Sequence, residues 1–230
     1  MYLVTGSSRG LGLELVKLLA VRGEQVIGVS RSASEFSHPN YSHYEVDISN
    51  EKEIPALFHE VRRLGKLSYL INNAAIAISR PALLTSAGSF EETLRVNLVG
   101  SFIISREALK LMKVQGFGRI INISSINVKL ASAGGVAYNA AKAGLENVAQ
   151  TLSSEIHYSE DITINNVGVS LVDGSGMVEK LSDKALADKT KYLKRSSLLK
   201  PEEILHTIDF FASPTARNIS GHTIYFGGLN

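Results

Sequence analysis

The stretch Thr5-Gly6-Ser7-Ser8-Arg9-Gly10-Leu11-Gly12 decides the fold of this chain. It follows a short apolar run and precedes a segment with apolar residues at three- and four-residue steps, so it predicts a glycine turn between a strand and a helix. Glycines let the backbone approach a pyrophosphate, whose charge the free N–H groups of the helix start can bind. An ordinary glycine turn is the alternative for the motif alone. The residues predicted to bind a cofactor here are Gly6, Ser8, Arg9, Gly10, Leu11 and Gly12.

Outward from this turn, short apolar runs alternate with longer segments of helical period, which is typical of a parallel sheet with crossover helices. The sequence therefore predicts an α/β fold, a Rossmann-type doubly wound parallel sheet of about seven strands with helices on both faces. The expected strands are 2–5, 25–30, 42–46, 69–72, 119–124, 163–169 and 223–226. The expected helices are 11–22, 51–64, 89–114, 138–158 and 201–212.

Two segments depart from the alternation. The connection from Arg31 to Tyr41 is short and contains Ser, His, Pro and Asn, so no full helix is expected there. Residues 171–200 contain a turn and a charged helical stretch without a matching strand, and we expect them to form a substrate lid.

Length and composition restrict the class of protein. A chain of 230 residues with 44% apolar and 20% charged residues predicts one globular domain over 1–230. A net charge of +2 does not favour nucleic acid as a partner. The chain lacks cysteine and any metal-ligand spacing of its six histidines, so no metal site is expected. With no signal peptide and no apolar run of about 20 residues, we expect a cytoplasmic protein with no membrane contact.

The end of the second expected strand indicates which dinucleotide is preferred. NAD-binding proteins usually carry an acidic residue there, about 20 residues after the glycine turn. This chain has Ser30 and Arg31 instead, and Arg9 lies in the glycine turn. Guanidinium groups suit a 2′-phosphate, so the sequence favours NADP(H) and places Ser30 and Arg31 among the cofactor-binding residues. Two solvated arginines are the alternative.

Tyr138 and Lys142 are candidates for proton transfer. Their spacing puts them on one face of the helix that Tyr138 starts. A phenol titrates near pH ~10, and a neighbouring ammonium favours the phenolate and eases proton exchange. Ser125 directly follows the expected strand 119–124, at the sheet edge where a hydroxyl could donate to a substrate carbonyl oxygen. The alternative for Ser125 is a capping serine, and the absence of a plausible histidine partner argues against a hydrolase nucleophile.

Taken together, these motifs resemble the short-chain dehydrogenase/reductase family, in its compact NADP-preferring form. The resemblance covers nearly the whole chain. It rests on the glycine turn, Asp47, Asn72-Asn73-Ala74-Ala75, Asn97, Ser125, Tyr138-x-x-x-Lys142 and the segment Gly221 to Gly228.

The resemblance implies catalytic roles for Asn97, Ser125, Tyr138 and Lys142. Tyr138 resembles the general acid of carbonyl reduction, and Ser125 resembles the residue that polarises the carbonyl. Lys142 would bind the nicotinamide ribose and lower the tyrosine pKa, while Asn97 would support a water chain. The resemblance also implies cofactor contacts by Asp47, which would meet the adenine, and by Ile48, Asn73, Ala74, Tyr138, Lys142 and Val172.

The chain departs from the family pattern in two places. Ala75 stands where the family usually has glycine. The sixth strand of the family commonly ends in Pro-Gly, with a threonine four residues later, whereas this chain has Val169-Ser170 and Gly174. The second departure puts the nicotinamide contacts around Val172 in question.

The leading prediction is an NADPH-dependent oxidoreductase that reduces a ketone or aldehyde to an alcohol, with Tyr138 as proton donor. A catalytically impaired NADP(H)-binding regulatory or scaffold protein is the alternative. The basic residues of the expected lid suggest the hypothesis of an anionic or carrier-bound substrate, but a solvated charged face is the favoured explanation for them. These residues are Lys180, Lys184, Lys189, Lys191, Lys194, Arg195 and Lys200.

The resemblance also implies a homodimer or homotetramer. In related proteins, the helices expected at 89–114 and 138–158 form the contacts between subunits. The apolar residues that could serve such a contact or the core are Phe102, Ile104, Leu145 and Val148.

Overall fold

The computed structural model describes residues 1–157, 159–176, 178, 190, 193–194 and 197–228. Its centre is a seven-stranded sheet in the order β3-β2-β1-β4-β5-β6-β7, with every neighbouring pair parallel. This confirms the predicted doubly wound sheet. The strands are β1 (Tyr2–Thr5), β2 (Val26–Ser30), β3 (Tyr41–Glu45), β4 (Tyr69–Asn72), β5 (Phe117–Ser125), β6 (Asp161–Val169) and β7 (Thr223–Tyr225).

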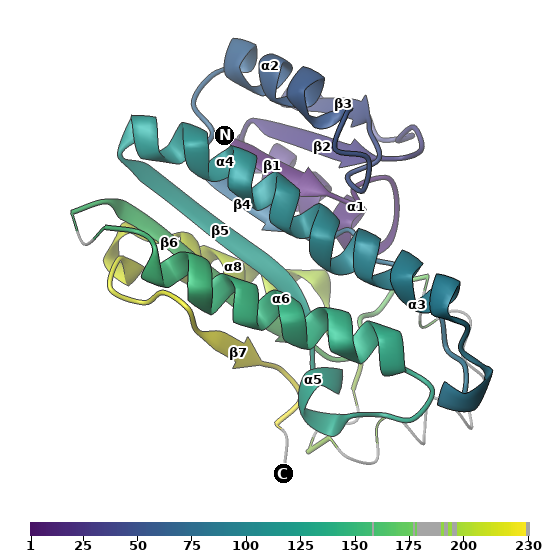
Figure 1. The fold of residues 1–230 in the computed structure, drawn as a ribbon. Coiled ribbons are helices and arrows are strands. Elements are labelled where there is room, and N and C mark those ends of the chain that lie inside the picture. The colour runs from purple at the N-terminus through teal and green to yellow at the C-terminus, as the bar shows by residue number, and fades with distance from the viewer. Residues whose placement is uncertain (158, 177, 179–189, 191–192, 195–196, 229–230) are drawn as a thin grey trace.

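Helices cover both faces of the sheet (Figure 1). Helices α2, α4 and α6 lie on one face, and α1 and α8 lie on the other. The α-helices are α1 (Gly10–Val21), α2 (Ile54–Leu64), α3 (Ala87–Leu94), α4 (Ser101–Gln115), α5 (Asn127–Leu130), α6 (Val136–Ser154) and α8 (Pro201–Ala212). The short 3-10 helices are η1 (Ala82–Leu84) and η3 (Pro214–Ala216).

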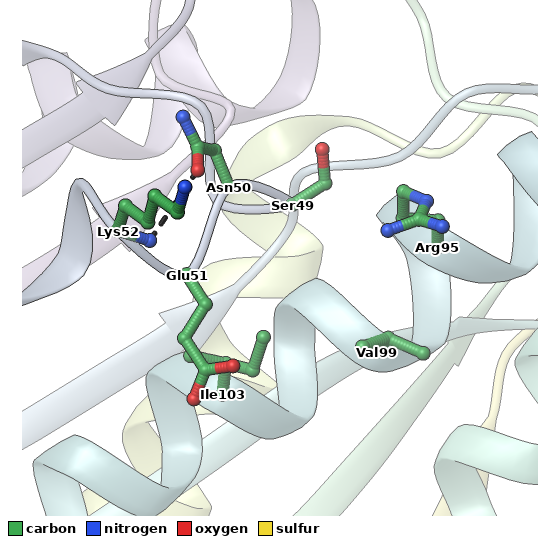
Figure 2. A pocket seen from close by; sticks show the side chains of 7 residues that line it. All are labelled: Ser49, Asn50, Glu51, Lys52, Arg95, Val99 and Ile103. Atoms are coloured by element: carbon green, nitrogen blue, oxygen red, sulfur yellow. Dashed lines mark hydrogen bonds between the residues drawn. The ribbon is translucent and has the colours of Figure 1, made fainter.

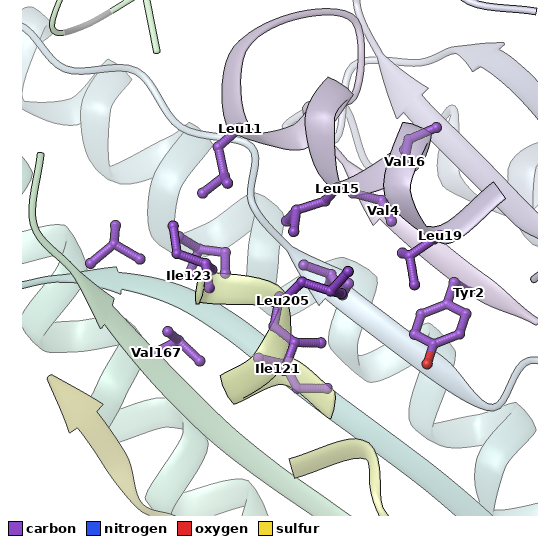
Figure 3. Packing of buried hydrophobic residues seen from close by; sticks show 14 of the residues in the cluster. Tyr2, Val4, Leu11, Leu15, Val16, Leu19, Ile121, Ile123, Val167 and Leu205 are labelled. Atoms are coloured by element: carbon purple, nitrogen blue, oxygen red, sulfur yellow. The ribbon is translucent and has the colours of Figure 1, made fainter. Parts of the chain in front are cut away.

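The alternation of side chains along β1 shows how the sheet separates two cores. Tyr2 and Val4 join the cluster beneath α1 and α8, whereas Leu3 joins the cluster beneath α2, α4 and α6. Figure 3 shows the first cluster, where leucines of α1 meet apolar residues of β1, β5, β6 and α8. The strand buried on both faces therefore reads as a continuous apolar run.

The helical stretch expected over 89–114 runs from Ala87 to Gln115 but contains an insertion. Residues Arg95–Gly100, labelled η2, form a π-helical segment between α3 and α4. The apolar spacing predicts the length of the stretch but not this change of hydrogen bonding. π-Helical segments are frequent at functional sites, and this one contains Asn97.

The apolar residues assigned to either core or subunit contacts fall into two groups. Ile104 and Leu145 are buried within the chain, so they belong to the core. Phe102 and Val148 are partly exposed.

Between β2 and β3, the connection contains no helix, as expected from its composition. Within the described residues, none of the helices has both the length and the apolar composition needed to cross a membrane.

Candidate active site

The sheet changes direction of strand order between β1 and β4, which is where open α/β sheets bind ligands. The glycine turn that follows β1 lies at this point. Gly10 begins α1 with φ of +57°, a conformation that favours glycine. The first backbone bond into the helix runs from Leu13 N to Arg9 O, and the side chain of Arg9 does not cap α1. The first N–H groups of α1 therefore remain available to a phosphate, which fits a dinucleotide cofactor.

Asn73 joins the end of β4 to the glycine turn. Its Nδ2 donates to Thr5 O at 3.0 Å and to Gly6 O at 3.2 Å. The backbone N–H groups of Asn73 and Ala74 each donate to Thr5 Oγ1 at 3.1 Å. A Cβ at Gly12 would lie 2.2 Å from Gly6 O and 2.4 Å from Asn73 Nδ2, so only glycine fits there. This clamp keeps the turn close to the neighbouring strand.

The two arginines expected at a 2′-phosphate lie in segments that follow neighbouring strands. Gly6 N donates to Val29 O at 2.7 Å, which ties the glycine turn to the end of β2. Arg9 and Arg31 are both exposed, and neither forms an ion pair within the described part of the chain. Their guanidinium groups are therefore available to an anionic ligand.

Sequence reasoning missed His43, which contacts the residues on either side of Arg31 at the end of β2. His43 Nε2 lies 3.0 Å from Ser32 O and 3.1 Å from Ser30 Oγ, and Ser30 Oγ donates to Ser32 O at 2.7 Å. The hydroxyl of Tyr41 lies 2.6 Å from His43 Nδ1. These contacts fix the backbone around Arg31. The register of β2 and β3, which pairs Gly28 with His43, could not be read from local motifs.

Asp47, expected beside the adenine, and Ile48, expected at the cofactor, follow β3. Asp47 Oδ1 accepts bonds from Ser49 N at 2.9 Å and Ser49 Oγ at 2.7 Å. The side chain of Ile48 is buried next to Gly100, where a Cβ would come within 3.0 Å of it. Both residues therefore help to shape the turn that precedes α2.

A pocket of about 380 Å³ opens next to this turn (Figure 2). One wall is formed by the turn at residues 49–52, and the other by the helical stretch that begins at Arg95. Tyr138 is not part of it, so this hollow is separate from the proton-transfer residues. The lining residues are Ser49, Asn50, Glu51, Lys52, Arg95, Val99 and Ile103.

Tyr138, Ser125 and Lys142 come together where β5 ends against the first turns of α6. Burial raises the pKa of Tyr138, and a hydrogen bond with Ser125 acts in the opposite direction. Ser125 Oγ also accepts a bond from Asn127 N at 3.2 Å, so this hydroxyl caps a turn as well. Tyr138 is buried, with 9% of the residue exposed.

Lys142 is buried beneath Tyr138. Its Nζ lies 5.8 Å from the centroid of the Tyr138 ring and donates to Ile123 O at 2.6 Å. Burial lowers the lysine pKa to about 8, and the charge of Glu146 opposes this shift. The ammonium is thus close enough to act on the phenol electrostatically.

Asn97 is fully buried in the π-helical segment. Its Oδ1 accepts from Ile76 N and its Nδ2 donates to Ile76 O, both at 2.8 Å. The amide therefore anchors the loop that follows β4. Its contribution to a water chain stays a prediction.

The altered segment after β6 lies over the glycine turn. Val172 is buried and pairs with Leu199 in an isolated parallel bridge. A Cβ at Gly10 would lie 3.8 Å from Ser175 Cα and from Gly176 N. The segment therefore lies next to the glycine turn, although it has Val169-Ser170 in place of Pro-Gly. Of the expected lid, residues 177, 179–189, 191–192 and 195–196 lie outside the described residues, and so do most of its basic side chains.

A second feature that sequence reasoning missed is Glu146, one helical turn after Lys142. Ser124 Oγ donates to Glu146 Oε1, and the Tyr225 hydroxyl donates to Glu146 Oε2. The only sequence signal was the regular spacing of Tyr138, Lys142 and Glu146. Among the described residues, no group of three or more His, Asp or Glu side chains could bind a metal ion.

The arrangement brings the start of α1 and the buried Tyr138 to the carboxyl edge of one sheet. A family model described as short chain dehydrogenase matches residues 1–186. The 3-oxoacyl-[acyl-carrier-protein] reductase FabG of Rickettsia conorii is 32% identical over 230 residues, covering 98% of this chain and 94% of the relative. The enzyme of the same name from Vibrio cholerae serotype O1 is 30% identical over 233 residues, covering 98% and 95%.

The fold also matches solved structures. A 4-hydroxyisoleucine dehydrogenase complexed with NADH superposes with a TM-score of 0.90 at 26% identity, covering 99% of this chain and 97% of that one. The family match, the relatives and the shared fold agree with the site geometry. The chain therefore belongs to the short-chain dehydrogenase/reductase family, and it is an oxidoreductase that acts on CH–OH or C=O groups.

Proposed function

We propose that this protein reduces a ketone or aldehyde to an alcohol with NADPH, and that Tyr138 is the proton donor. The observation that carries the proposal is the buried group at the end of β5, where Tyr138 is bonded to Ser125 and lies above Lys142. When bound, the nicotinamide supplies the hydride that the carbonyl carbon receives. The protein then has to bind the carbonyl, orient it and give its oxygen a proton.

The side chains divide this work as follows. The Ser125 hydroxyl donates a hydrogen bond to the carbonyl oxygen, and Tyr138 transfers its phenolic proton to the same oxygen. Lys142 favours the resulting phenolate through its charge and binds the ribose. Asn97 keeps the loop after β4 in place, and water bound near it returns a proton to Tyr138.

The preference for NADPH rests on Arg9 and Arg31. Both are exposed guanidinium groups on segments that the bond from Gly6 N to Val29 O ties together. Positions 30 and 31 hold serine and arginine, so neither offers an acidic side chain that would bind ribose hydroxyls or repel a phosphate. The other proposed cofactor contacts are Gly6, Ser8, Gly10, Leu11, Gly12, Asp47, Ile48, Asn73, Ala74 and Val172.

For the substrate, we propose a 3-oxoacyl group bound to a carrier, as the names of the FabG relatives state for those enzymes. The loop before α3 offers an apolar surface for an acyl chain, because Leu83 is 99% exposed and Leu84 is 70% exposed. This loop is joined to the loop before α6 by a bond from Arg80 N to Gly134 O at 2.9 Å. We also propose a homodimer or homotetramer, with Phe102 and Val148 in the contact.

The first test is calorimetry of NADPH and NADH binding to the purified chain. One charge-assisted contact predicts that NADPH binds about 10-fold more tightly. Equal affinities would contradict the roles of Arg9 and Arg31. Binding of neither cofactor would contradict both the proposed reductase and the alternative of an NADP(H)-binding protein without turnover.

The second test is NADPH oxidation in the presence of acetoacetyl-coenzyme A and a panel of simple ketones and aldehydes. Tyr138→Phe removes the proton donor, so we expect kcat to fall by about 10³-fold or more. NADPH affinity of this variant should stay within about threefold of wild type, because the ring remains. Turnover by Tyr138→Phe at the wild-type rate would refute Tyr138 as the donor.

A further inference from the structure

A buried carboxylate lies behind the proton-transfer residues. Glu146 is 9% exposed on α6, in the row formed by Tyr138 and Lys142 at four-residue steps. Burying a carboxylate is unfavourable unless its charge is compensated. Both of its oxygens accept hydroxyl bonds, one from Ser124 on β5 and one from Tyr225 on β7. Accepting at both oxygens is the pattern of an ionised carboxylate.

Glu146 and Lys142 contact the same end of β5. Lys142 Nζ donates to Ile123 O at 2.6 Å, and the next residue, Ser124, donates its hydroxyl to Glu146. Ser125 follows directly and is bonded to Tyr138. The helix that carries the acid is thus fastened to the strand end that carries the carbonyl-binding hydroxyl.

Within the described residues, the polar and charged side chains that contact Lys142 or Glu146, directly or through Tyr225, come from three elements besides β5. Helix α6 contributes Tyr138 and Glu146, and β7 contributes the phenol of Tyr225. Helix α5 contributes Lys129, whose Nζ lies 5.3 Å from the centroid of the Tyr225 ring. Strand β5 contributes only the neutral hydroxyls of Ser124 and Ser125 to this set. Burial and the bond to Glu146 raise the pKa of Tyr225, so this residue stays a neutral donor at physiological pH.

We propose that Glu146 is a positioning residue of the reductase site: its buried charge keeps the Lys142 ammonium protonated, and its bonds to Ser124 and Tyr225 fix the end of β5 against α6. The importance of this residue for catalysis rests on the proposed function. Without the carboxylate, burial alone acts on Lys142, whose pKa of about 8 already lies near physiological pH. A neutral lysine would no longer favour the Tyr138 phenolate.

The test titrates Lys142 directly, without a substrate. The full chain is labelled with ¹³C-lysine, and the Cε resonance of Lys142 is assigned by its absence in Lys142→Met. In wild type we expect a midpoint at about pH 8. Glu146→Gln keeps the shape and removes the charge, so we expect the midpoint to fall by about one pH unit. Glu155→Gln, at the exposed end of the same helix, is the matched control and should leave the midpoint unchanged.

A second variant keeps the proposal testable if Glu146→Gln does not fold. Tyr225→Phe removes one of the two hydroxyl donors that compensate the buried charge of Glu146. We therefore expect the Lys142 midpoint to move in Tyr225→Phe and to stay at the wild-type value in the matched Glu155→Gln. An unchanged midpoint in Tyr225→Phe, or an unchanged midpoint in folded Glu146→Gln, would overturn the proposal.

The catalytic consequence is a shift of the pH profile. We expect the alkaline limb of kcat for NADPH-dependent reduction to move to lower pH in Glu146→Gln, by the same shift as the Lys142 midpoint. A chain without any reductase activity would refute the proposed function and leave the titration result standing. A shifted midpoint with an unshifted pH profile would overturn the positioning role while leaving the proposed function intact.

Discussion

At the glycine-turn end of the sheet, the contacts that shape the site join backbone groups to one another and to the neutral amide of Asn73. At the Tyr138 end, they run through a buried ammonium, a buried carboxylate and the phenol of Tyr225. The first region has to be stiff and to approach a ligand closely, which small neutral groups permit. In the proposed function the second has to move a proton, which requires titratable groups whose charges balance one another. The two regions should therefore respond to different perturbations.

Gly12→Ala should give the largest effect, and only at the glycine-turn end. The new Cβ would lie 2.2 Å from Gly6 O, so the turn and the Asn73 clamp have to move apart. We expect the free energy of unfolding to fall by about 3 kcal/mol. NADPH affinity should fall by about 100-fold or more, measured by calorimetry. Gly88→Ala, where a Cβ meets nothing within 4 Å, is the control and should bind NADPH like wild type.

The Lys142 titration measured in Gly12→Ala shows whether the two regions are independent. A midpoint equal to that of wild type would support the comparison. A midpoint displaced by as much as in Glu146→Gln would mean that the two regions form one network.

The pH dependence of stability should come from the Tyr138 end. Burial lowers the Lys142 pKa from its usual 10.5 to about 8, so the unfolded chain binds more protons than the folded chain between these values. The free energy of unfolding therefore rises with pH between about pH 8 and 10.5. Below pH 8 the folded state carries the full destabilisation from burying the charged Lys142. We expect wild type to gain about 2 kcal/mol relative to Lys142→Met between pH 7 and 9.5, measured by urea unfolding. A constant difference between the two proteins would contradict a buried, titrating Lys142.

Arg31→Ala should give a smaller effect, confined to the proposed 2′-phosphate contact at the end of β2. Loss of one charge-assisted contact predicts that NADPH affinity falls by about 10-fold and NADH affinity stays unchanged. Arg217→Ala, another exposed arginine, lies after η3 and serves as the control. A parallel loss of NADH affinity would mean that Arg31 supports the fold of the corner and does not select the phosphate.

The comparison also explains which features the sequence predicts. The glycine turn is a contiguous stretch in which each residue acts through its own backbone, so its spacing predicts both its place in the fold and its shape. The same holds for the seven strands and for the lack of a helix between Arg31 and Tyr41. The π-helical segment at Arg95–Gly100 could not be predicted, because one altered helical turn barely changes the spacing of the apolar residues.

The partners of Glu146 could not be predicted for a different reason. Ser124 lies 22 residues before Glu146, and Tyr225 lies 79 residues after it. No local pattern connects such positions, because their contact depends on the packing of α6 against β5 and β7. The same is true of His43, whose bonds to Ser30 and Ser32 depend on the pairing of β2 with β3.

His43→Ala should give the smallest effect, at the end of β2 next to Arg31. His43 does not carry the proposed phosphate contact but bonds to Ser30 Oγ and Ser32 O on either side of Arg31. Its removal frees the backbone there, so we expect NADPH affinity to fall by about threefold with NADH affinity unchanged. His38→Ala lies in the same connection and contacts Asn40 N instead, so it should have no such effect. Equal losses for both cofactors would show that His43 supports the glycine-turn end as a whole, because its neighbour Tyr41 also reaches Ser7 Oγ, at 3.5 Å.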